Sequence, residues 1–381
     1  MSMIRPQDFP AASRCTYLNS ASVALMFQGA SEATLAWERD IADFGTLNFD
    51  ERAEDAVFDE LRAQFAGLIG AASSDVAVAS SATELIASLA WAVMPPAGSN
   101  IVACDVVFPS TVYPWARTAR HTGCELRWVK ARDGMVSEDD LLAAIDDRTA
   151  VVCISQVEYG TGQRYDLARL AEAAHAHGAL LAVDATQAAG AIPIDVAKEP
   201  VDALISASYK WMCGPFGVGL MYLAPRWQAA LEPGLVGWRS HKDVYDLQAD
   251  RLEYRPDARR FEFSTMAYGC AIGLAKSIGY LREIGVARVY EHNLRLADEL
   301  LESLRRVDAQ IVSPTSSKSR TSIVGFRLPG WRPENVVARL GEQGIVVSRR
   351  RDLVRVSPHL YNTSQDIERL AEALAGIVHR R

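Results

Sequence analysis

A lysine stands where an apolar run ends in the stretch ALISASYKWMCGPFGVG, residues 203 to 219. Most single lysines in proteins are exposed to solvent, so a surface charge is the ordinary explanation for Lys210. A desolvated lysine, in contrast, gives up its proton readily and can act as a nucleophile or a base. Lys210 is therefore either a surface charge or the chemical centre of the protein, and its neighbours in space decide between the two.

Other chemically useful residues also follow the ends of apolar runs. The segment SSATE (80–84) has the spacing of a capping box, which predicts a helix start whose free backbone N–H groups can bind an anion. Phe108 follows a second run, Asp184 ends a third, and Gln187 comes three residues later. Taken singly, these residues have ordinary explanations: a cap, a core ring and a turn residue. If the runs are parallel strands, their carboxyl ends meet at one edge of a sheet, which predicts a single site that includes Lys210.

This combination of groups suits the chemistry of pyridoxal 5'-phosphate (PLP). A lysine forms a Schiff base with the aldehyde of PLP, an acid pairs with its pyridinium nitrogen, and a helix N-terminus takes its phosphate. An aromatic ring then stacks on the pyridine ring. The residues therefore predict PLP as the cofactor, with Lys210 and Asp184 as its main partners.

The elements that must position these residues follow a regular order between about residues 50 and 250. Short apolar runs alternate there with segments of helical period, and fully apolar strands in such an order predict a mostly parallel sheet buried on both faces. The expected strands are VAVAS (76–80), NIVAC (100–104), ELRWV (125–129), AVVCIS (150–155), ALLAVDA (179–185), VDALISA (201–207) and GVGLMYL (217–223). After about residue 270 the pattern changes to two helical segments, broken near Gly285, and then to short strands and helices. This change predicts a smaller α+β domain at the C-terminus.

Composition limits the classes of function. The chain has 381 residues, a net charge of −7 and 49% hydrophobic residues, which favours two domains and argues against nucleic acid or an anionic membrane as a partner. Its six cysteines form no CxxC pair and predict neither a disulfide framework nor a metal site. The first residues lack the apolar core of a signal peptide, and no apolar run approaches membrane-spanning length. We therefore expect a cytoplasmic protein. There is no P-loop, HExxH or GxSxG motif.

Six segments, in order along nearly the whole chain, carry a resemblance to a known family: YLNSAS (17–22), SSATE (80–84), VDATQAAG (183–190), SASYKWMCGPFGVG (206–219), RRFEFST (259–265) and VRVSPHLYNT (354–363). The chain resembles the class V aminotransferase group of fold type I PLP-dependent enzymes, which includes cysteine desulfurases, isopenicillin N epimerase-like proteins and kynureninases. The resemblance implies a large PLP-binding domain at residues 26–265, with a mostly parallel sheet of the seven-stranded type. It also implies a small α+β domain at 266–381 and an N-terminal segment, 1–25, that associates with the small domain and the active site.

The resemblance also implies roles for matched positions. Lys210 is implied as the Schiff-base lysine and the base that moves the Cα proton, Asp184 as the partner of the pyridinium nitrogen, and Gln187 as a donor to the phenolic oxygen. The phosphate is implied to lie against Ala82 and Thr83, joined by Ser206 or Ser208 and by Tyr209, with Phe108 as the stacking ring and Tyr159 beside the cofactor. Thr265 matches a residue that reaches the phosphate from a neighbouring subunit, which implies a homodimer.

The substrate side of the site is implied in the same way. Arg355 matches an arginine that clamps the carboxylate of an amino-acid substrate, a bidentate role that suits a planar guanidinium. Asn19 and Ser20 lie in the segment that lines the substrate pocket in this family.

The departures from the family pattern bear on the reaction. Tyr209 stands where many relatives carry a histidine, and Tyr159 stands near where desulfurases use an asparagine. Desulfurases also need a nucleophilic cysteine shortly before the carboxylate-binding arginine, whereas GEQGIVVSRRRDLV (341–354) contains none, so an ordinary desulfurase is disfavoured. The arginines 349–351 in that stretch are either a solvated hairpin or, in our hypothesis, supply at least one side chain that reads an acidic substrate.

The expected reaction begins when an α-amino acid forms an external aldimine with PLP and Lys210 removes the Cα proton. We predict an aminotransferase. A β-lyase such as a C–S lyase, with Tyr159 as its acid, and an epimerase are alternatives of the same chemistry, and a non-catalytic PLP-binding relative is an alternative of another class.

Overall fold

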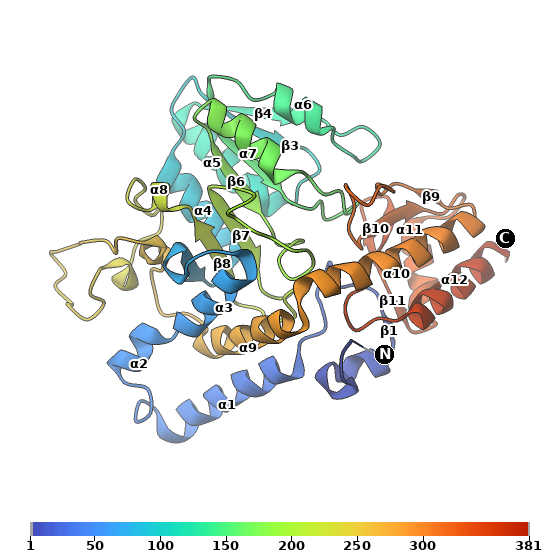
Figure 1. The fold of residues 1–381 in the computed structure, drawn as a ribbon, viewed down its shortest axis with the longest axis horizontal. Helices are drawn as coiled ribbons and strands as arrows, with labels where there is room; N and C mark the ends of the chain where they lie inside the picture. Colours follow the sequence, from blue (N-terminus) through green and yellow to red (C-terminus); the bar gives the residue numbers. More distant parts are fainter. Residues whose placement is uncertain (1–2, 380–381) are drawn as a thin grey trace.

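The structure is a computed structural model that describes residues 3–379. Its centre is a seven-stranded sheet with the order β2-β8-β7-β6-β5-β3-β4 (Figure 1). The strands are β2 (Val76–Ala79), β3 (Asn100–Cys104), β4 (Glu125–Val129), β5 (Thr149–Ser155), β6 (Leu180–Asp184), β7 (Ala203–Ala207) and β8 (Gly219–Leu223). Each expected apolar run supplies one of them, and every pairing is parallel except those of β8 with its two neighbours. The prediction of a mostly parallel α/β sheet is confirmed.

Helices bury this sheet. They are α3 (Asp59–Ile69), α4 (Ala82–Val93), α5 (Pro109–Thr122), α6 (Glu138–Ala143), α7 (Leu167–Ala176) and the short α8 (Pro225–Gln228). Every residue of β2, β3, β6, β7 and β8 is buried, which explains why these strands read as continuous apolar runs instead of alternating ones. The edge strand β4 differs, because Glu125 and Trp128 are exposed there.

The C-terminal part is a separate α+β layer with its own apolar core. Its four-stranded sheet has the order β12-β13-β10-β9, and the two-residue strands β1 and β11 pair beside it in parallel. The strands are β1 (Thr16–Tyr17), β9 (Gln310–Ile311), β10 (Val324–Arg327), β11 (Ile345–Val346), β12 (Ser348–Arg350) and β13 (Leu353–Val356). The helices are α10 (Val286–Arg306), α11 (Pro333–Gly341) and α12 (Ser364–His379). The pairing of β1 with β11 ties the N-terminal segment to this layer.

The exact domain boundaries stay a prediction, and one helix bears on them. The remaining helices are α1 (Gln28–Phe44), α2 (Glu51–Ala56) and α9 (Tyr268–Ile284). We expected the small domain to begin at residue 266, but α9 packs along α1 and α3 beneath the large sheet (Figure 1). Because α9 buries its residues in the large core, this packing favours a boundary near Gly285, where the chain turns with φ of 90° into α10.

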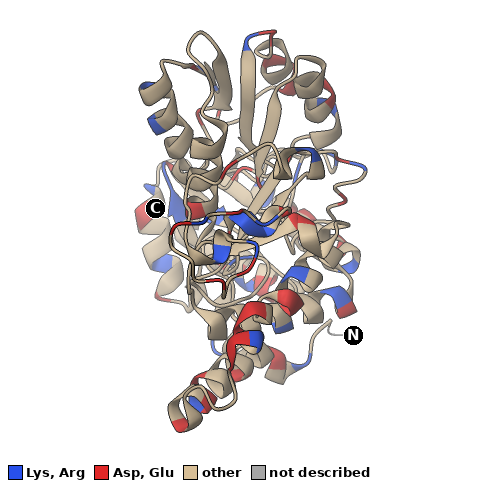
Figure 2. Cartoon of the chain, turned by 90° about the vertical axis from the view of Figure 1, so that its left-hand side faces the viewer, with Lys and Arg blue, Asp and Glu red and all other residues tan. Residues whose placement is uncertain are grey.

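In the cartoon of Figure 2, acidic and basic residues of the described chain are interspersed along the ribbon. Within residues 3–379, no helix has the length and apolar character needed to cross a bilayer. In the same range, no group of three or more His, Cys, Asp or Glu side chains is placed to hold a metal ion.

Candidate active site

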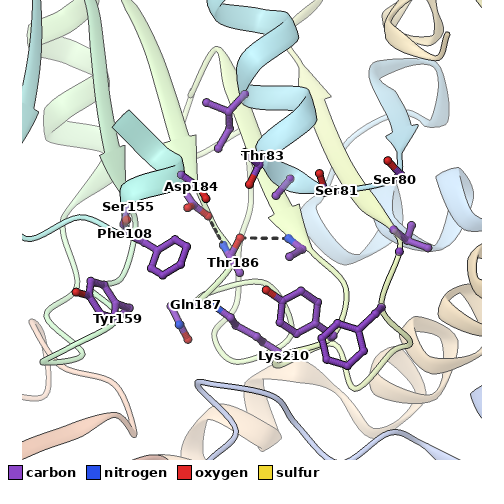
Figure 3. Close-up of a pocket in the computed structure, with 18 of the residues that line it drawn as sticks. Ser80, Ser81, Thr83, Phe108, Ser155, Tyr159, Asp184, Thr186, Gln187 and Lys210 are labelled. Atoms are coloured by element: carbon purple, nitrogen blue, oxygen red, sulfur yellow. Dashed lines mark hydrogen bonds between the residues drawn. The ribbon is translucent and has the colours of Figure 1, made fainter. Parts of the chain in front are cut away.

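A cavity of about 270 Å³ lies at the carboxyl ends of β5, β6 and β7 and at the start of α4 (Figure 3). Several of the predicted site residues meet there: Ala82, Thr83, Phe108, Tyr159, Asp184, Gln187, Tyr209 and Lys210 all line it. The convergence expected from parallel strand ends is therefore present in the fold.

Lys210 is not a surface charge. The loop that follows β7 folds back on itself, because the N–H of Ser208 donates to the carbonyl of Val218 at 3.3 Å and the N–H of Cys213 donates to that of Lys210 at 2.8 Å. Lys210 is 7% exposed at the apex of this loop, and its Nζ lies 5.4 Å from the ring centre of Phe108. Burial lowers the pKa of Lys210 to about 8, against the attraction of Asp184. The lysine is thus close to the neutral form that nucleophilic and base chemistry require.

Asp184 is held in one orientation by two donors. The hydroxyl of Thr111, on α5, donates to its Oδ2 at 2.7 Å, and the N–H of Thr186 donates to its Oδ1 at 2.9 Å. Sequence reasoning did not find Thr111, because the contact joins α5 to β6 and leaves no local pattern. The hydroxyl of Thr186 accepts from the N–H of Ala207 at 3.1 Å, which ties the turn after β6 to the end of β7. The carboxylate is therefore fixed at the floor of the cavity.

Gln187 is oriented by the residue that follows Lys210. The indole N–H of Trp211 donates to Gln187 Oε1 at 2.7 Å, and Gln187 Nε2 donates to the carbonyl of Ala21 at 2.9 Å. This arrangement fixes which end of the amide is the donor, and Nε2 keeps a second N–H for a group in the cavity. Trp211 is itself anchored, because its carbonyl accepts from Nε2 of the buried His359 at 3.0 Å.

The start of α4 offers an anion site. Ser81 caps the helix by accepting from the N–H of Glu84 at 3.2 Å, as the capping-box spacing predicts. The carboxylate of Glu84 turns to Ser80 instead, whose N–H donates to it at 2.9 Å. Among the described residues, nothing accepts from the backbone N–H groups of Ala82 and Thr83, which face the cavity. Together with the positive end of the helix dipole, these groups suit a phosphate.

Comparison with known proteins decides the family. The family model described as Aminotransferase class-V matches residues 16–370. The chain belongs to the class V aminotransferase family. It is 27% identical over 369 residues to an "uncharacterized aminotransferase" of Bacillus subtilis, covering 97% of this chain and 96% of that one. It is 28% identical to a "probable cysteine desulfurase" of Methanothermobacter thermautotrophicus, covering 84% and 83%. Among solved structures, the apo cysteine desulfurase of Thermococcus onnurineus has the same fold, with a TM-score of 0.89 at 24% identity over 100% of both chains.

The cavity of this class V enzyme fits PLP, the cofactor of the family. A buried amine, an oriented carboxylate, an amide donor and a helix start with unused N–H groups surround one space of about 270 Å³. Lys210 would hold the aldehyde, Asp184 the ring nitrogen and the start of α4 the phosphate.

Two predicted phosphate ligands do not reach this class V cavity. The hydroxyl of Ser206 donates to the carbonyl of Ala207 at 3.2 Å, and that of Ser208 donates to the carbonyl of Pro215. Both serines are fully buried, and neither lines the cavity. Side chains alternate along β7, so the side chain of Ala207 faces the cavity and that of Ser206 faces away. The structure corrects the prediction that Ser206 or Ser208 joins Ala82 and Thr83.

Other predicted residues of the class V pattern lie beside the cavity or away from it. Ser20 is buried with its Oγ 2.6 Å from the hydroxyl of Tyr361, so it braces the N-terminal segment and does not line the cavity. Asn19 also lies outside the lining, and its Oδ1 accepts from the hydroxyl of Ser22 at 2.6 Å. Asn19 and Ser20 thus lie outside the lining of this cavity, and their predicted contact with a substrate stays a prediction. Thr265 is exposed on the segment before α9, and its predicted role at a neighbouring subunit stays a prediction.

Arg355 is buried completely on β13. Its Nε donates to the hydroxyl of Ser348 at 3.2 Å, Nη1 to the carbonyl of Tyr159 at 2.7 Å, and Nη2 to the hydroxyl of Ser22 at 2.6 Å. Burial, reinforced by the neighbouring Arg350, lowers the pKa of Arg355 to about 9. No carboxylate among the described residues forms an ion pair with it. Sequence reasoning missed Ser22, although it stands in the matched segment YLNSAS.

Replacing Trp211 with phenylalanine should weaken PLP binding about fivefold, the effect of about 1 kcal/mol from one neutral hydrogen bond. Phenylalanine keeps an aromatic ring at this position but cannot donate to Gln187, so the amide can turn its oxygen toward the cofactor. The measurements are the PLP dissociation constant and the absorbance maximum of the bound cofactor. Trp227→Phe is the matched control, because it also removes an indole donor, to Asp202, away from the cavity. Equal spectra and affinities in the two variants would contradict a positioning role for Trp211.

Proposed function

We propose that this protein is a PLP-dependent aminotransferase that acts on an α-amino acid. Lys210 carries the proposal: it is a buried amine with a pKa lowered to about 8, placed in the same cavity as the oriented carboxylate of Asp184. A single base of this kind can take a proton from one carbon and return it to another, which is the central event of transamination.

Several residues prepare the substrate for that transfer. When bound, PLP supplies an aldehyde that links to an amino group and a ring that stabilises negative charge on the adjacent carbon. Asp184 would hold a proton on the ring nitrogen, and Thr111 and Thr186 keep its carboxylate in place. The neutral Nζ of Lys210 would take the proton from the substrate Cα and return it to another carbon. Phe108 lies over the cavity and limits the access of water to Lys210.

The lack of a cysteine in the described cavity supports an aminotransferase over a desulfurase. No cysteine lines the cavity in the described chain, and the hairpin of β12 and β13 has arginines where desulfurases carry their acceptor cysteine. Cys153 is fully buried, and burial raises the pKa of its thiol to about 12. A buried thiol of this kind stays protonated and does not accept sulfur.

A β-lyase is the second candidate, and the position of Tyr159 favours it. Its ring contacts Phe108 edge to face with centroids 5.5 Å apart, and it lines the cavity of Lys210. A phenol at this place could donate a proton to a group leaving from Cβ. The homodimer and the cytoplasmic location expected from the sequence stay predictions.

One experiment separates the two candidates. The protein loaded with PLP is mixed with a panel of amino acids in the absence of any keto acid, and the cofactor spectrum is followed. Stoichiometric conversion to pyridoxamine phosphate, with one equivalent of keto acid released, is the result expected of an aminotransferase. Continued release of keto acid and ammonia while the cofactor keeps its original spectrum would contradict transamination and support elimination.

The covalent uptake of PLP by cofactor-free protein should accelerate as the pH rises through about 8 and then level off. Only the neutral amine of Lys210 attacks an aldehyde, and its depressed pKa makes that form abundant above pH 8, whereas an exposed lysine with a pKa near 10.4 would gain neutral amine well beyond that point. Stopped-flow absorbance at fixed PLP measures the rate, with N-acetyl-lysine as the unburied control. A protein rate that follows the control up to high pH would show that Lys210 is not desolvated.

A further inference from the structure

The hairpin of β12 and β13 presents two arginines on one face. The antiparallel register places Ser348 opposite Arg355 and Arg350 opposite Leu353. Because side chains alternate along a strand, Arg350 shares the face of Ser348 and Arg355, while Arg349 points to the other side. Arg349 is accordingly exposed, and its Nε donates to the carbonyl of Arg351 at 2.8 Å. Strand parity thus separates Arg350 from Arg349, whereas Arg351 lies beyond the strand, and its Nη2 donates to the carbonyl of Asp105 at 3.2 Å.

Arg350 and Arg355 converge on one neutral oxygen. Nη2 of each guanidinium donates to the hydroxyl of Ser22, both at 2.6 Å. This hydroxyl donates its own hydrogen bond to Asn19 Oδ1 at 2.6 Å, so both of its lone pairs are free to accept. A single serine oxygen therefore lies between two cations, at the kind of position where an anion would be expected.

The two arginines have no ion-pair partner among residues 3–379. Neither arginine forms an ion pair with a described carboxylate, and the acid at the tip of the same hairpin, Asp352, is taken by Nε of Arg327 at 2.7 Å. Burial lowers the pKa of Arg350, and Arg355 is buried completely. One fully buried cation beside a half-buried one, without a counterion, is costly, and a bound anion would lower that cost.

The pair lies next to the cavity of Lys210. Tyr159 contributes its carbonyl to Arg355 and lines both that cavity and a smaller one of about 70 Å³, whose wall includes Arg350. The charges of both arginines also act on Lys210 and help to lower its pKa. A molecule linked at Lys210 could therefore extend past Tyr159 toward the two guanidinium groups.

We propose that Arg350 and Arg355 form a two-cation subsite that selects α-amino acids with a second carboxylate on the side chain. Arg355 takes one carboxylate of the substrate and Arg350 takes the other. This inference rests on the proposed function, since it names the substrate class of the same site.

Dicarboxylates without an amino group test the subsite apart from any turnover. Glutarate and butyrate are titrated into the PLP-loaded protein, and binding is followed by calorimetry and by the cofactor absorbance. Wild-type protein should bind glutarate at least about 10-fold more tightly than butyrate, because the second carboxylate gains a charge-assisted contact. Arg350→Ala should remove that preference by weakening glutarate alone.

Arg349→Ala is the matched control. It deletes the neighbouring guanidinium on the opposite face of the same strand and should leave both affinities unchanged. Arg350→Gln, which keeps a polar side chain of similar length, should lose the preference as Arg350→Ala does, provided that the cofactor spectrum and thermal midpoint match the wild type. Equal binding of glutarate and butyrate by the wild type would overturn the inference. So would an equal loss for both ligands in Arg350→Ala, since both arginines would then hold one carboxylate.

The outcomes also separate this inference from the proposed function. A clear preference for glutarate without any conversion of the cofactor by amino acids would refute the aminotransferase and keep the subsite. A different result would refute the subsite and keep the aminotransferase. In that case alanine or leucine would convert the cofactor as fast as aspartate or glutamate, and glutarate would bind no better than butyrate.

Discussion

Replacing Lys210 with alanine should reduce the rate of cofactor conversion by an amino acid by a factor of about 10² to 10⁴, the range for loss of a positioned general base. The substitution removes the only amine that lines the cavity in the described chain. Asp184, Gln187 and the start of α4 remain, so we expect PLP to bind more weakly but still specifically. The measurement is single-turnover absorbance with a substrate identified from the amino-acid panel.

A matched control and a rescue make this result specific. Lys276→Ala removes an exposed lysine on α9 and should change the rate by less than about twofold. Added methylamine, which can enter the space left by the side chain, should restore part of the rate as the pH rises and its neutral form accumulates. A Lys210→Ala protein that converts the cofactor at the wild-type rate would rule out Lys210 as the base and with it the proposed mechanism.

Fold and cofactor could be predicted because their signals are local. Strands buried on both faces are almost entirely apolar, so the strands of the sheet interior can be recognised in the sequence as continuous apolar runs. Asp184 and Lys210 follow directly on such runs, and parallel strand ends have to meet at one edge. Family segments such as VDATQAAG (183–190) then added roles that spacing alone does not give.

What the sequence could not show depends on strand parity and on contacts between distant segments. Ser206 and Ser208 flank the end of β7, and only the observed orientation of Ala207 reveals that they face away from the cavity. Thr111 reaches Asp184 from another element, and Ser22 reaches Arg355 across more than 300 residues of sequence. No local pattern records such contacts.

The three arginines at 349–351 also show that the sequence alone does not give the orientation of side chains. Sequence reasoning suggested that one of the three arginines reads an acidic substrate, but the choice needs the register of β12 on β13. That register puts Arg350 beside Arg355, and it gives the hypothesis a control residue at the next position.

Replacing Gly219 with alanine should reduce PLP affinity and lower the free energy of unfolding by about 1–3 kcal/mol, the usual cost of overpacking. Gly219 begins β8 beside the start of α4, and a Cβ there would overlap the carbonyl carbon of Ser81 and lie 2.5 Å from the N of Ala82. These atoms belong to the backbone, so they cannot move aside without shifting the first turn of α4. The N–H groups of Ala82 and Thr83 would move with it and would no longer point toward the phosphate.

The measurements are the PLP dissociation constant, the dissociation constant of inorganic phosphate, and the thermal midpoint. Gly376→Ala in α12 is the control, because a Cβ there meets nothing within 4 Å and should leave all three unchanged or raise the midpoint slightly. Phosphate binding distinguishes a change at the start of α4 from a general loss of stability. If α4 forms the phosphate site, Gly219→Ala should reduce the affinities for phosphate and for PLP by similar factors. A less stable Gly219→Ala protein that binds both ligands as the wild type does would place the phosphate site elsewhere in the cavity, because the displaced backbone of α4 would then not be part of it.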